Sequence, residues 1–268
     1  IIQYQSMQDD RLQGNHIVVT GAAQGIGRGI ATRVAEAGAD VTIFDLDTDT
    51  AAETKSLVEE QGTSAQIIEV DVTDQEAVSN GVESAINALG PIHGLVNNAG
   101  IQRSIPILEL SEAEWDAHMD VNAKGVFFCC REVAEQMIEE NIEGSIVNIA
   151  STGATRPFPG QGVYAATKAG VVGFTIVLAK ELAEYGITAN CLNPGTVDTP
   201  MVQQWLKENA AQTDRTEDEF LQDALDLHVL DRMGKPREIC HIATLLLSEE
   251  GDWITGEAIN IDGGYSVN

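Results

Sequence analysis

Short apolar runs alternate with longer amphipathic stretches along most of this chain. The apolar runs are continuous, which is typical of strands buried on both faces of a parallel sheet. They lie at 16–20, 40–44, 65–70, 92–97, 144–150, 188–193 and 258–261. Helical periodicity predicts helices near 25–37, 50–61, 74–89 and 112–139, and one through Tyr164 to about Tyr185. Right-handed crossovers then give a doubly wound, Rossmann-type α/β fold of about seven parallel strands, with helices on both faces.

The 268 residues contain no linker-like segment and no internal repeat, so we expect a single domain over 1–268. Residues 1–14 are expected to form an N-terminal extension. Ile1–Ser6 precede Met7, and we expect them to contribute nothing to the fold. The segment 201–233 falls between the sixth and seventh expected strands, and we expect it to cover a substrate as a lid.

The charge is strongly negative, with 42 acidic against 15 basic residues and a net charge of −27. This balance argues against binding to nucleic acid or to an anionic membrane surface, which both need positive charge. The acidic residues are dispersed rather than collected in a tail, which favours a strongly hydrated surface and adaptation to high salt. No apolar run approaches 18 residues and no signal peptide is visible, so a cytoplasmic protein is expected.

Metal-ligand spacings are not found in the sequence. The four cysteines show no C-x-x-C pattern, and Cys129 and Cys130 stand in an apolar helical stretch where they read as small buried residues. His118, on an acidic helical stretch, is expected at the surface. We therefore expect no metal site.

Unusual residues gather at the carboxyl ends of the expected strands, where ligands bind in sheets of this kind. Gly21, Gly25 and Gly27 follow the first strand and open the first helix. Glycines there permit a tight turn and let the backbone approach a pyrophosphate at the helix N-terminus. The spacing is G-x-x-x-G-x-G rather than the commoner G-x-G-x-x-G, and its position predicts a dinucleotide site.

A carboxylate at the end of the second strand selects between the two nicotinamide dinucleotides. Asp45 can accept hydrogen bonds from both ribose hydroxyls and would repel a 2′-phosphate. The next nine residues contain no Arg or Lys to offset it, so NAD(H) is expected rather than NADP(H). Asp47 is the better candidate for capping the following helix. Asp71, after the third strand, is expected to contact adenine, with helix capping as its alternative role.

Tyr164 and Lys168 stand four residues apart in V-Y-A-A-T-K-A-G, and Ser151 lies upstream of both. One helical turn puts the phenol and the ammonium on the same face. A cation about 5 Å away, at an effective dielectric of about 20, favours the phenolate by roughly 3 kcal/mol. We therefore expect a lowered Tyr164 pKa and a proton carrier suited to alcohol–ketone chemistry.

Together these motifs resemble the short-chain dehydrogenase/reductase family over nearly the whole chain. The matching elements are T-G-A-A-Q-G-I-G at 20–27, N-N-A-G at 97–100, Asn122 in D-V-N-A-K-G, Ser151, Y-A-A-T-K at 164–168, N-P-G-T-V-D-T-P at 193–200 and I-T-G-E-A-I-N-I-D-G-G near the end. The four catalytic positions all fit the family pattern.

The resemblance implies a role for each catalytic residue. Tyr164 would exchange a proton with the substrate oxygen, and Ser151 would hydrogen-bond and orient that oxygen. Lys168 would lower the Tyr164 pKa and hold the nicotinamide ribose, while Asn122 would bind a water linking Lys168 to solvent. The implied cofactor-binding set is Gly21, Gln24, Gly25, Ile26, Gly27, Asp45, Leu46, Asp71, Val72, Asn98, Ala99, Gly100, Tyr164, Lys168, Pro194, Gly195, Thr196, Val197 and Thr199.

The substrate is less strongly indicated. N-N-A-G-I-Q-R-S-I-P resembles gluconate and 3-hydroxybutyrate dehydrogenases, so Gln102 and Arg103 are candidate substrate contacts beside Ser151 and Tyr164. Arg156 could reach the same pocket as a carboxylate partner. The alternative role for Arg103 and Arg156 is a surface or subunit contact. Gly153 and Gln161 replace a His and a Lys that hydroxybutyrate enzymes carry there, which weakens that assignment.

A polyol, sugar or sugar acid is therefore the expected substrate. A 3-oxoacyl thioester or a 3-hydroxy acid is the alternative. The competing class of function is a dinucleotide-binding regulator without catalysis. The family resemblance also implies a homotetramer formed through the helices near 112–139 and 161–185.

Overall fold

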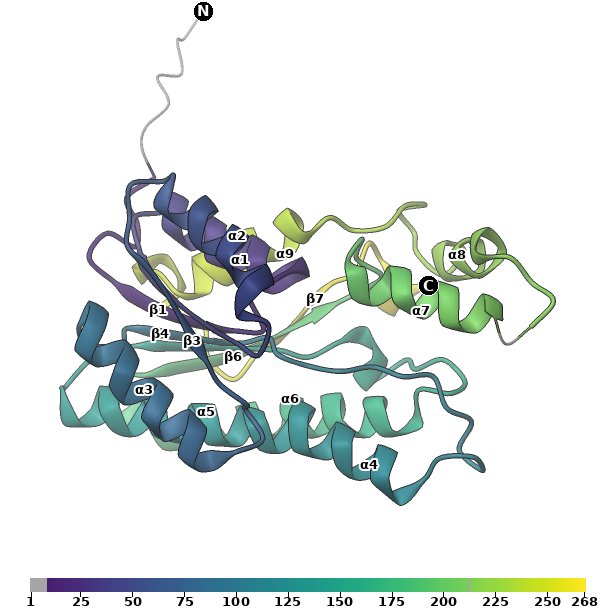
Figure 1. Ribbon diagram of the computed structural model, residues 1–268, viewed down its shortest axis with the longest axis horizontal. Coiled ribbons are helices and arrows are strands. Elements are labelled where there is room, and N and C mark those ends of the chain that lie inside the picture. Colours follow the sequence, from purple (N-terminus) through teal and green to yellow (C-terminus); the bar gives the residue numbers. More distant parts are fainter. Residues whose placement is uncertain (1–8, 212) are drawn as a thin grey trace, which may run out of the picture.

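One parallel sheet contains all seven strands of the computed structural model, which describes residues 9–211 and 213–268. The strand order is β3-β2-β1-β4-β5-β6-β7, and every neighbouring pair is parallel (Figure 1). The strands are β1 His16–Thr20, β2 Asp40–Asp45, β3 Ala65–Glu69, β4 Gly94–Asn97, β5 Ser145–Ile149, β6 Thr188–Pro194 and β7 Ala258–Ile261. The predicted doubly wound fold is confirmed.

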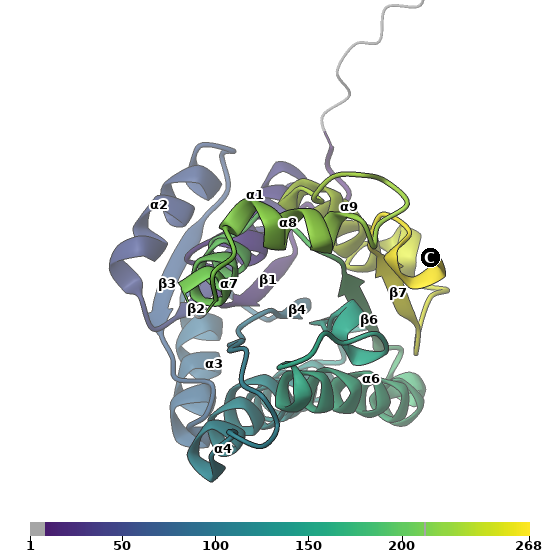
Figure 2. The same ribbon diagram turned by 90° about the vertical axis from the view of Figure 1, so that its right-hand side faces the viewer.

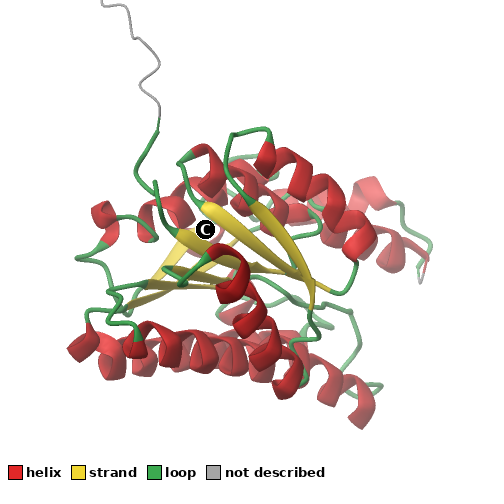
Figure 3. Cartoon of the chain, turned by 60° about the vertical axis from the view of Figure 1, so that its left-hand side comes forward, coloured by secondary structure: helices red, strands yellow, loops and turns green. Residues whose placement is uncertain are grey.

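Helices form a layer on each face of the sheet (Figures 1 and 3). One layer contains α1 Gly25–Glu36, α2 Thr48–Glu59 and α9 Pro236–Leu246. The other contains α3 Gln75–Leu89, α4 Glu112–Met119, α5 Gly125–Glu139 and α6 Gly162–Leu182. Two further helices, α7 Pro200–Ala211 and α8 Glu217–Leu225, lie across the end of the sheet instead (Figure 2).

The continuous apolar strands contribute side chains to two separate hydrophobic cores. In β1, Ile17 and Val19 belong to the core beneath α1 and α9, while Val18 between them joins the core beneath α3, α5 and α6. All three are fully buried. Because successive strand side chains point to opposite faces, a strand covered on both sides must be apolar at every position.

The predicted helix at 112–139 is confirmed, with one irregularity that the sequence did not indicate. A π-helical turn at Asp120–Lys124 separates α4 from α5. Within it, the Asn122 amide accepts a hydrogen bond from Ile101 N at 2.8 Å and donates one to Ile101 O at 2.9 Å. Wide turns of this kind are frequent at functional sites. Helical periodicity continues on both sides of this turn, so the sequence did not indicate it.

The segments outside the predicted elements also have structure. Helix α9 was missed in the sequence, although Pro236 at its first position is a typical start signal. Within the expected extension 1–14, residues 1–8 lie outside the described residues. Leu12, however, is fully buried, and its N–H donates to Ala37 O at 2.9 Å, so this part of the extension belongs to the fold.

Helix α6 and its following turn, Gly162–Tyr185, are long and apolar enough to cross a membrane by length and composition alone, with a mean hydropathy of 1.5. The helix lies against the sheet, with Thr167, Lys168 and Val171 on its buried face. The core helix of a globular domain passes the same test, so this is weak evidence for a membrane span.

The strand order reverses between β1 and β4, because β1 pairs with β2 on one side and β4 on the other. The two crossovers leave in opposite directions there, and a crevice opens beyond the strand ends. Helices α7 and α8 lie over this edge (Figure 2). The fold therefore places every loop at the carboxyl ends of the strands around one crevice.

Candidate active site

A groove with two connected halves follows the carboxyl edge of the sheet. One half is lined by the loops after β1, β2 and β3, and the other by the loops after β5 and β6 together with α7. Both halves share five lining residues, Ile26, Asn98, Gly100, Thr199 and Met201. An extended ligand could therefore pass continuously from one half to the other.

The turn between β1 and α1 is shaped for a phosphate. Gly21 and Gly25 both have φ of +62°, in the left-handed region that favours glycine. A Cβ on Gly21 would lie 2.7 Å from Ala99 Cα, so a side chain is also excluded by close packing. In the described chain, α1 begins without a side-chain cap and without an acidic residue in its first turn. Its free N–H groups fit an anion.

Gly27 does not line the groove, although the sequence placed it among the cofactor contacts. A Cβ on Gly27 would lie 2.3 Å from Gly21 O and 2.4 Å from Asn98 Nδ2. The missing side chain lets the β1 turn and Asn98 approach the helix. Gly27 thus supports the site through close packing rather than contact.

Asn98 and Thr20 join the loops after β4 and β1. The Asn98 amide donates to Gly21 O at 2.8 Å and to Thr20 O at 3.1 Å. The Thr20 hydroxyl accepts from the N–H groups of Asn98 and Ala99, each at 3.0 Å. Thr20 was not singled out in the sequence, although it precedes the glycine turn. These bonds fix the floor where the two halves of the groove meet.

Asp45 lies in the first half of the groove, as predicted. Its carboxylate accepts from Ala23 N at 2.8 Å and from Asp47 N at 3.0 Å. Asp47 caps α2 through Thr50 N, so the alternative capping role falls to it as expected. The neighbouring Arg28 is paired with Glu53 at 2.7 Å, which leaves its charge engaged elsewhere.

Four more predicted cofactor contacts line this half, Gln24, Leu46, Asp71 and Val72. Asp71 does not cap the following helix, because Asp74 holds that position and accepts from Glu76 N and Ala77 N. The Asp71 carboxylate instead accepts from Thr73 N at 2.9 Å. The competition between adenine contact and capping is thereby resolved against capping.

Ser151, Tyr164 and Lys168 line the second half of the groove together. Ser151 begins a short turn after β5, and its hydroxyl accepts from Gly153 N at 3.0 Å. Lys168 Nζ lies 5.8 Å from the centre of the Tyr164 ring and donates to Ile149 O at 2.8 Å. Strand end and helix face therefore bring the three predicted residues into one place.

Burial dominates the acid–base properties of this trio. It raises the pKa of Tyr164, and the Ser151 hydroxyl beside it acts in the opposite direction. Burial also lowers the pKa of Lys168 to about 8. The expected lowering of the Tyr164 pKa is therefore not found in the protein alone. Removing the phenolate from water costs more than the Ser151 hydrogen bond returns.

Asn122 reaches the same site through the π turn. It is fully buried, and its amide also donates to the Thr167 hydroxyl at 3.3 Å. A Cβ on Gly100 would lie 3.2 Å from Asn122 Oδ1 and 3.7 Å from Lys168 Nζ. The glycine thus leaves room beside both groups, and the turn places Asn122 within reach of the lysine.

The loop after β6 closes the groove on the nicotinamide side. Pro194, Gly195, Thr196, Val197 and Thr199 all line it, as predicted. The Thr152 hydroxyl donates to Pro194 O at 3.2 Å and so joins this loop to the serine turn. The loop therefore keeps a fixed position relative to Ser151.

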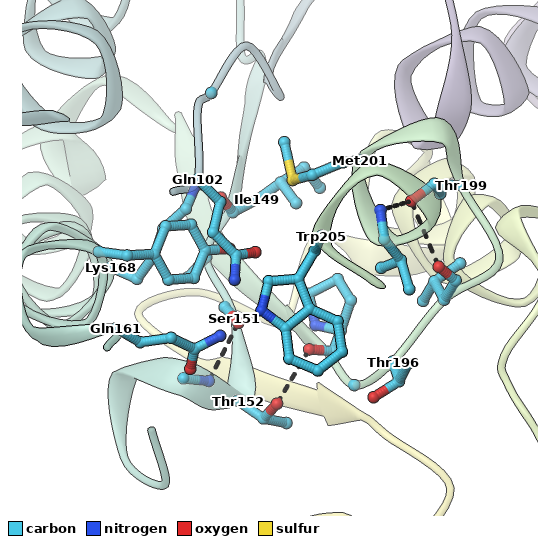
Figure 4. Close-up of a pocket in the computed structure, with 18 of the residues that line it drawn as sticks. Gln102, Ile149, Ser151, Thr152, Gln161, Lys168, Thr196, Thr199, Met201 and Trp205 are labelled. Atoms are coloured by element: carbon cyan, nitrogen blue, oxygen red, sulfur yellow. Dashed lines mark hydrogen bonds between the residues drawn. The ribbon is translucent and has the colours of Figure 1, made fainter. Parts of the chain in front are cut away.

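The remaining walls of the second half are mostly apolar (Figure 4). Phe158 and Trp205 have ring centres 6.1 Å apart, and Phe158 and Tyr265 6.0 Å apart. Trp205 Nε1 donates to Ser104 Oγ at 2.8 Å, which fixes the indole over the pocket. Met201 and Val202 from α7 complete the apolar wall. The sequence did not single out these side chains, because they come from segments far apart in the chain.

Two amides face this wall from the other side (Figure 4). Gln102 lines the pocket, which fits its predicted role. Gln161 is buried, and its Oε1 accepts from Phe158 N at 3.0 Å. The pocket thus combines an apolar wall with a few polar groups close to Tyr164 and Ser151, an arrangement common in small-molecule sites.

The two candidate arginines differ in position. Arg103 does not line the pocket; its guanidinium pairs with Glu114 at 2.7 Å and its side chain is 51% exposed. Its role as a substrate contact is therefore corrected to the alternative surface role. Arg156 does line the pocket, and its Nη1 donates to Asn268 O at 2.5 Å. Of the two, only Arg156 remains a candidate.

His118 is fully buried, against the expected surface position. Its ring bonds to Glu114 O at 2.7 Å and accepts from Arg103 N at 3.3 Å. The acidic neighbours in sequence face solvent, while the imidazole turns inward to hold the loop after β4. Among the described residues, no group of three His, Cys, Asp or Glu side chains could hold a metal ion.

Comparisons with known proteins agree with this geometry. A family model described as enoyl-(acyl carrier protein) reductase matches residues 21–266. The chain is 39% identical to a 3-oxoacyl-[acyl-carrier-protein] reductase of Thermotoga maritima, over 96% of this chain and 100% of that protein. It is 38% identical to the (2S)-[(R)-hydroxy(phenyl)methyl]succinyl-CoA dehydrogenase subunit of Thauera aromatica, over 96% of this chain and 98% of that protein.

A solved structure shows the same architecture. The 3-ketoacyl-(acyl-carrier-protein) reductase of Brucella melitensis, complexed with NADH, superposes with a TM-score of 0.85 and 33% identity. The match covers 96% of this chain and 100% of that one. Together with the seven-stranded sheet and the trio of Ser151, Tyr164 and Lys168, these matches show that the chain belongs to the classical short-chain dehydrogenase/reductase family.

Proposed function

We propose that this protein interconverts a 3-oxoacyl thioester and the corresponding 3-hydroxyacyl thioester with NAD(H). The observation that carries the proposal is the second half of the groove, where Tyr164 and Ser151 face an apolar wall of Phe158, Trp205 and Tyr265. An acyl group gains from such a wall, whereas a sugar would bury hydroxyls against it.

The comparisons favour this alternative over the polyol or sugar expected from the sequence. The Thermotoga maritima relative reduces a 3-oxoacyl group by name, and the Thauera aromatica relative is named for a hydroxy acyl-CoA. The two differ in the carrier of the acyl group. Both relatives support the proposal that the substrate of this chain is a thioester with an oxygen function near the acyl carbonyl.

The residues of the site divide the reaction between them. When bound, the nicotinamide supplies or accepts the hydride. In the reducing direction, Tyr164 gives its phenolic proton to the oxygen that forms from the ketone. The Ser151 hydroxyl hydrogen-bonds the same oxygen and holds the carbonyl in place. Lys168 favours the phenolate left on Tyr164, which keeps the proton transfer reversible.

The preference for NAD(H) rests on Asp45. Its carboxylate lies in the half of the groove that suits an adenosine, and Arg28, which donates to the Ala23 carbonyl, is paired with Glu53. A 2′-phosphate would meet a negative charge without a free partner. NADPH should therefore bind much more weakly than NADH.

Assembly and location complete the proposal. Phe127 on α5 and Ile176 and Val177 on α6 are 40%, 39% and 51% exposed, which gives these helices an apolar outer face. This face supports the homotetramer expected through 112–139 and 161–185. We further propose a cytoplasmic protein with a small-molecule substrate, and no nucleic-acid or membrane partner.

The proposal is tested by assaying purified protein with acetoacetyl-CoA and with a panel of polyols and aldonates, each with NAD(H) and NADP(H). We expect NADH-dependent reduction of the thioester and little turnover of the sugars. NAD⁺-dependent oxidation of one polyol or aldonate, with an unreactive thioester, would instead restore the substrate expected from the sequence.

A further inference from the structure

His228 follows the lid helix α8 and lies outside the residues assigned a catalytic or cofactor-binding role. It is only 6% exposed. Its ring bonds on both sides, Nδ1 to Ala224 O at 2.7 Å and Nε2 to Thr196 N at 3.2 Å. Ala224 belongs to the lid, and Thr196 to the loop after β6. Both of these residues line the substrate half of the groove.

The partners determine the tautomer of the ring. The Ala224 carbonyl can only accept, so Nδ1 carries the proton and donates it. Nε2 then has a free lone pair, which accepts from the Thr196 N–H. A second proton on the ring would place two donors face to face. The tautomer with its proton on Nδ1 is therefore the one that joins the lid to the loop.

One charged residue, Asp262, lies beside the imidazole, because a Cβ on Gly195 would contact both Asp262 and His228 Nε2. The Asp262 carboxylate accepts from Gly264 N and Ser266 N, so its oxygens are engaged within their own turn. Arg232 is paired with Glu238 at 2.7 Å. The Tyr265 ring lies 5.3 Å from the imidazole, and its hydroxyl donates to Arg156 O. None of these groups supplies the bond that His228 makes to Thr196.

Thr196 is also held from its other side by the end of the lid segment. Its carbonyl accepts from Gly234 N at 2.9 Å, and Gly234 O accepts from Asp198 N at 2.9 Å. The packing around the imidazole is close, because a Cβ on Gly195 would lie 3.0 Å from His228 Nε2. Both ends of the segment between α8 and α9 are thus hydrogen-bonded to the loop after β6.

We propose that His228 is a positioning residue that couples closure of the lid to the conformation of the nicotinamide loop. Its imidazole holds the Thr196 backbone only while α8 is in place. When α8 moves outward, the Thr196 N–H loses its acceptor, and the loop loses one of the bonds that hold it. Closure over a substrate and ordering of the cofactor loop then occur as one event. The coupling to cofactor rests on the proposed NAD(H)-dependent function.

Two amide variants separate the effects of the two hydrogen bonds that the ring makes, one to Ala224 and one to Thr196. His228→Asn places an amide near the position of Nδ1, so it can keep the bond to the lid but cannot reach Thr196. His228→Gln extends to the position of Nε2 and can accept from the Thr196 N–H. Both side chains are polar and suit the buried site. His241→Asn, at an exposed histidine on α9, is the matched control.

The first measurement is limited trypsin digestion in the absence of cofactor, following cleavage after Lys207 and Arg215 in the lid. We expect His228→Asn to be cut about tenfold faster than the wild type, with His228→Gln and His241→Asn close to the wild type. Equal cleavage rates in His228→Asn and His228→Gln would overturn the proposal, because packing alone would then explain the effect.

The second measurement is NADH binding by fluorescence, together with kcat and KM for acetoacetyl-CoA. In His228→Asn we expect the Kd for NADH and the KM for acetoacetyl-CoA to rise about tenfold, while kcat stays within about threefold. A fall in kcat with an unchanged Kd would contradict the coupling. Absence of NADH binding in the wild type would overturn the proposed function, and the digestion would still decide whether His228 joins lid and loop.

Discussion

The two halves of the groove are built in different ways. The half that suits the adenosine is made mainly by short segments directly after β1, β2, β3 and β4. The substrate half gathers side chains from β5, α6, α7, α8 and the C-terminal segment. The first is therefore a property of local motifs, whereas the second depends on how distant segments pack. Away from the shared lining and from the loop after β6, changes in one half should leave the other largely unaffected.

The largest effect is expected at the reacting oxygen. Tyr164→Phe removes the proton donor and keeps the ring, so kcat should fall by about 10³-fold. NADH binding should change by less than about threefold, because the groove keeps its shape. Steady-state kinetics and fluorescence titration measure the two quantities. If the variant loses NADH binding as well as kcat, the two halves of the groove depend on one another at this residue. A variant that kept its biological function would support the regulator instead.

The second effect should be confined to the adenosine half. Asp45→Asn removes the charge that faces a 2′-phosphate, so the ratio of kcat/KM with NADPH to that with NADH should rise about 30-fold. Asp47→Asn is the control, since an asparagine still caps α2. If both variants behave alike, Asp45 is not the residue that selects the cofactor.

The third effect should be confined to the substrate half. Trp205→Ala removes the indole that covers the pocket, so the KM for acetoacetyl-CoA should rise about tenfold. The kcat/KM for thioesters with longer acyl groups should rise relative to that for acetoacetyl-CoA. The Kd for NADH should stay constant. Trp115→Ala, at a half-exposed position on α4, provides the comparison. An unchanged preference among acyl lengths would show that the aromatic wall does not select the substrate by the length of its acyl chain.

Salt should act on both halves alike. With a net charge of −27, added KCl screens repulsion over the whole surface, and the melting temperature should rise by roughly 5 °C between about 0.1 M and about 2 M KCl. Thermal melts followed by circular dichroism measure this. A lower melting temperature at high salt would contradict adaptation to salt.

The smallest effect is expected at the opposite edge of the sheet, where His16 and His93 begin β1 and precede β4. Burial lowers the pKa of both. The folded state therefore binds their protons less readily than the unfolded chain, and stability falls as the pH drops below the unfolded value of about 6.5. We expect His16→Gln to reduce the acid-dependent loss in melting temperature by about 2 °C. An unchanged pH dependence would assign the loss to other groups.

The same contrast explains what the sequence could predict. The seven strands, the two helical layers, the glycine turn and the trio of Ser151, Tyr164 and Lys168 depend on periodicity and spacing within short stretches. Their positions were accurate to a few residues. The direction of the Tyr164 pKa was wrong, because burial can be evaluated only when the surrounding atoms are known.

Features that join distant segments were missed. Trp205 and Tyr265 meet Phe158 only because α7 and the C-terminal segment fold over the serine turn. Arg103 stood in a suggestive motif, yet Glu114 on α4 pairs with it outside the pocket. Arg103 stands in an irregular loop, where no periodicity indicates which of two neighbouring side chains turns inward.

The π turn at Asp120–Lys124 also has a consequence for how this chain can change. A wide turn holds one more residue than a regular helical turn, and each residue rotates an α-helix by about 100°. Deleting a single residue there would replace the π turn by regular α-helix and rotate α4 about the helix axis relative to α5. Asn122 would lose its hydrogen bonds to Ile101 and Thr167 without any change in its own identity. Insertions and deletions in this turn should thus be far less tolerated than substitutions on the outer surface of α4.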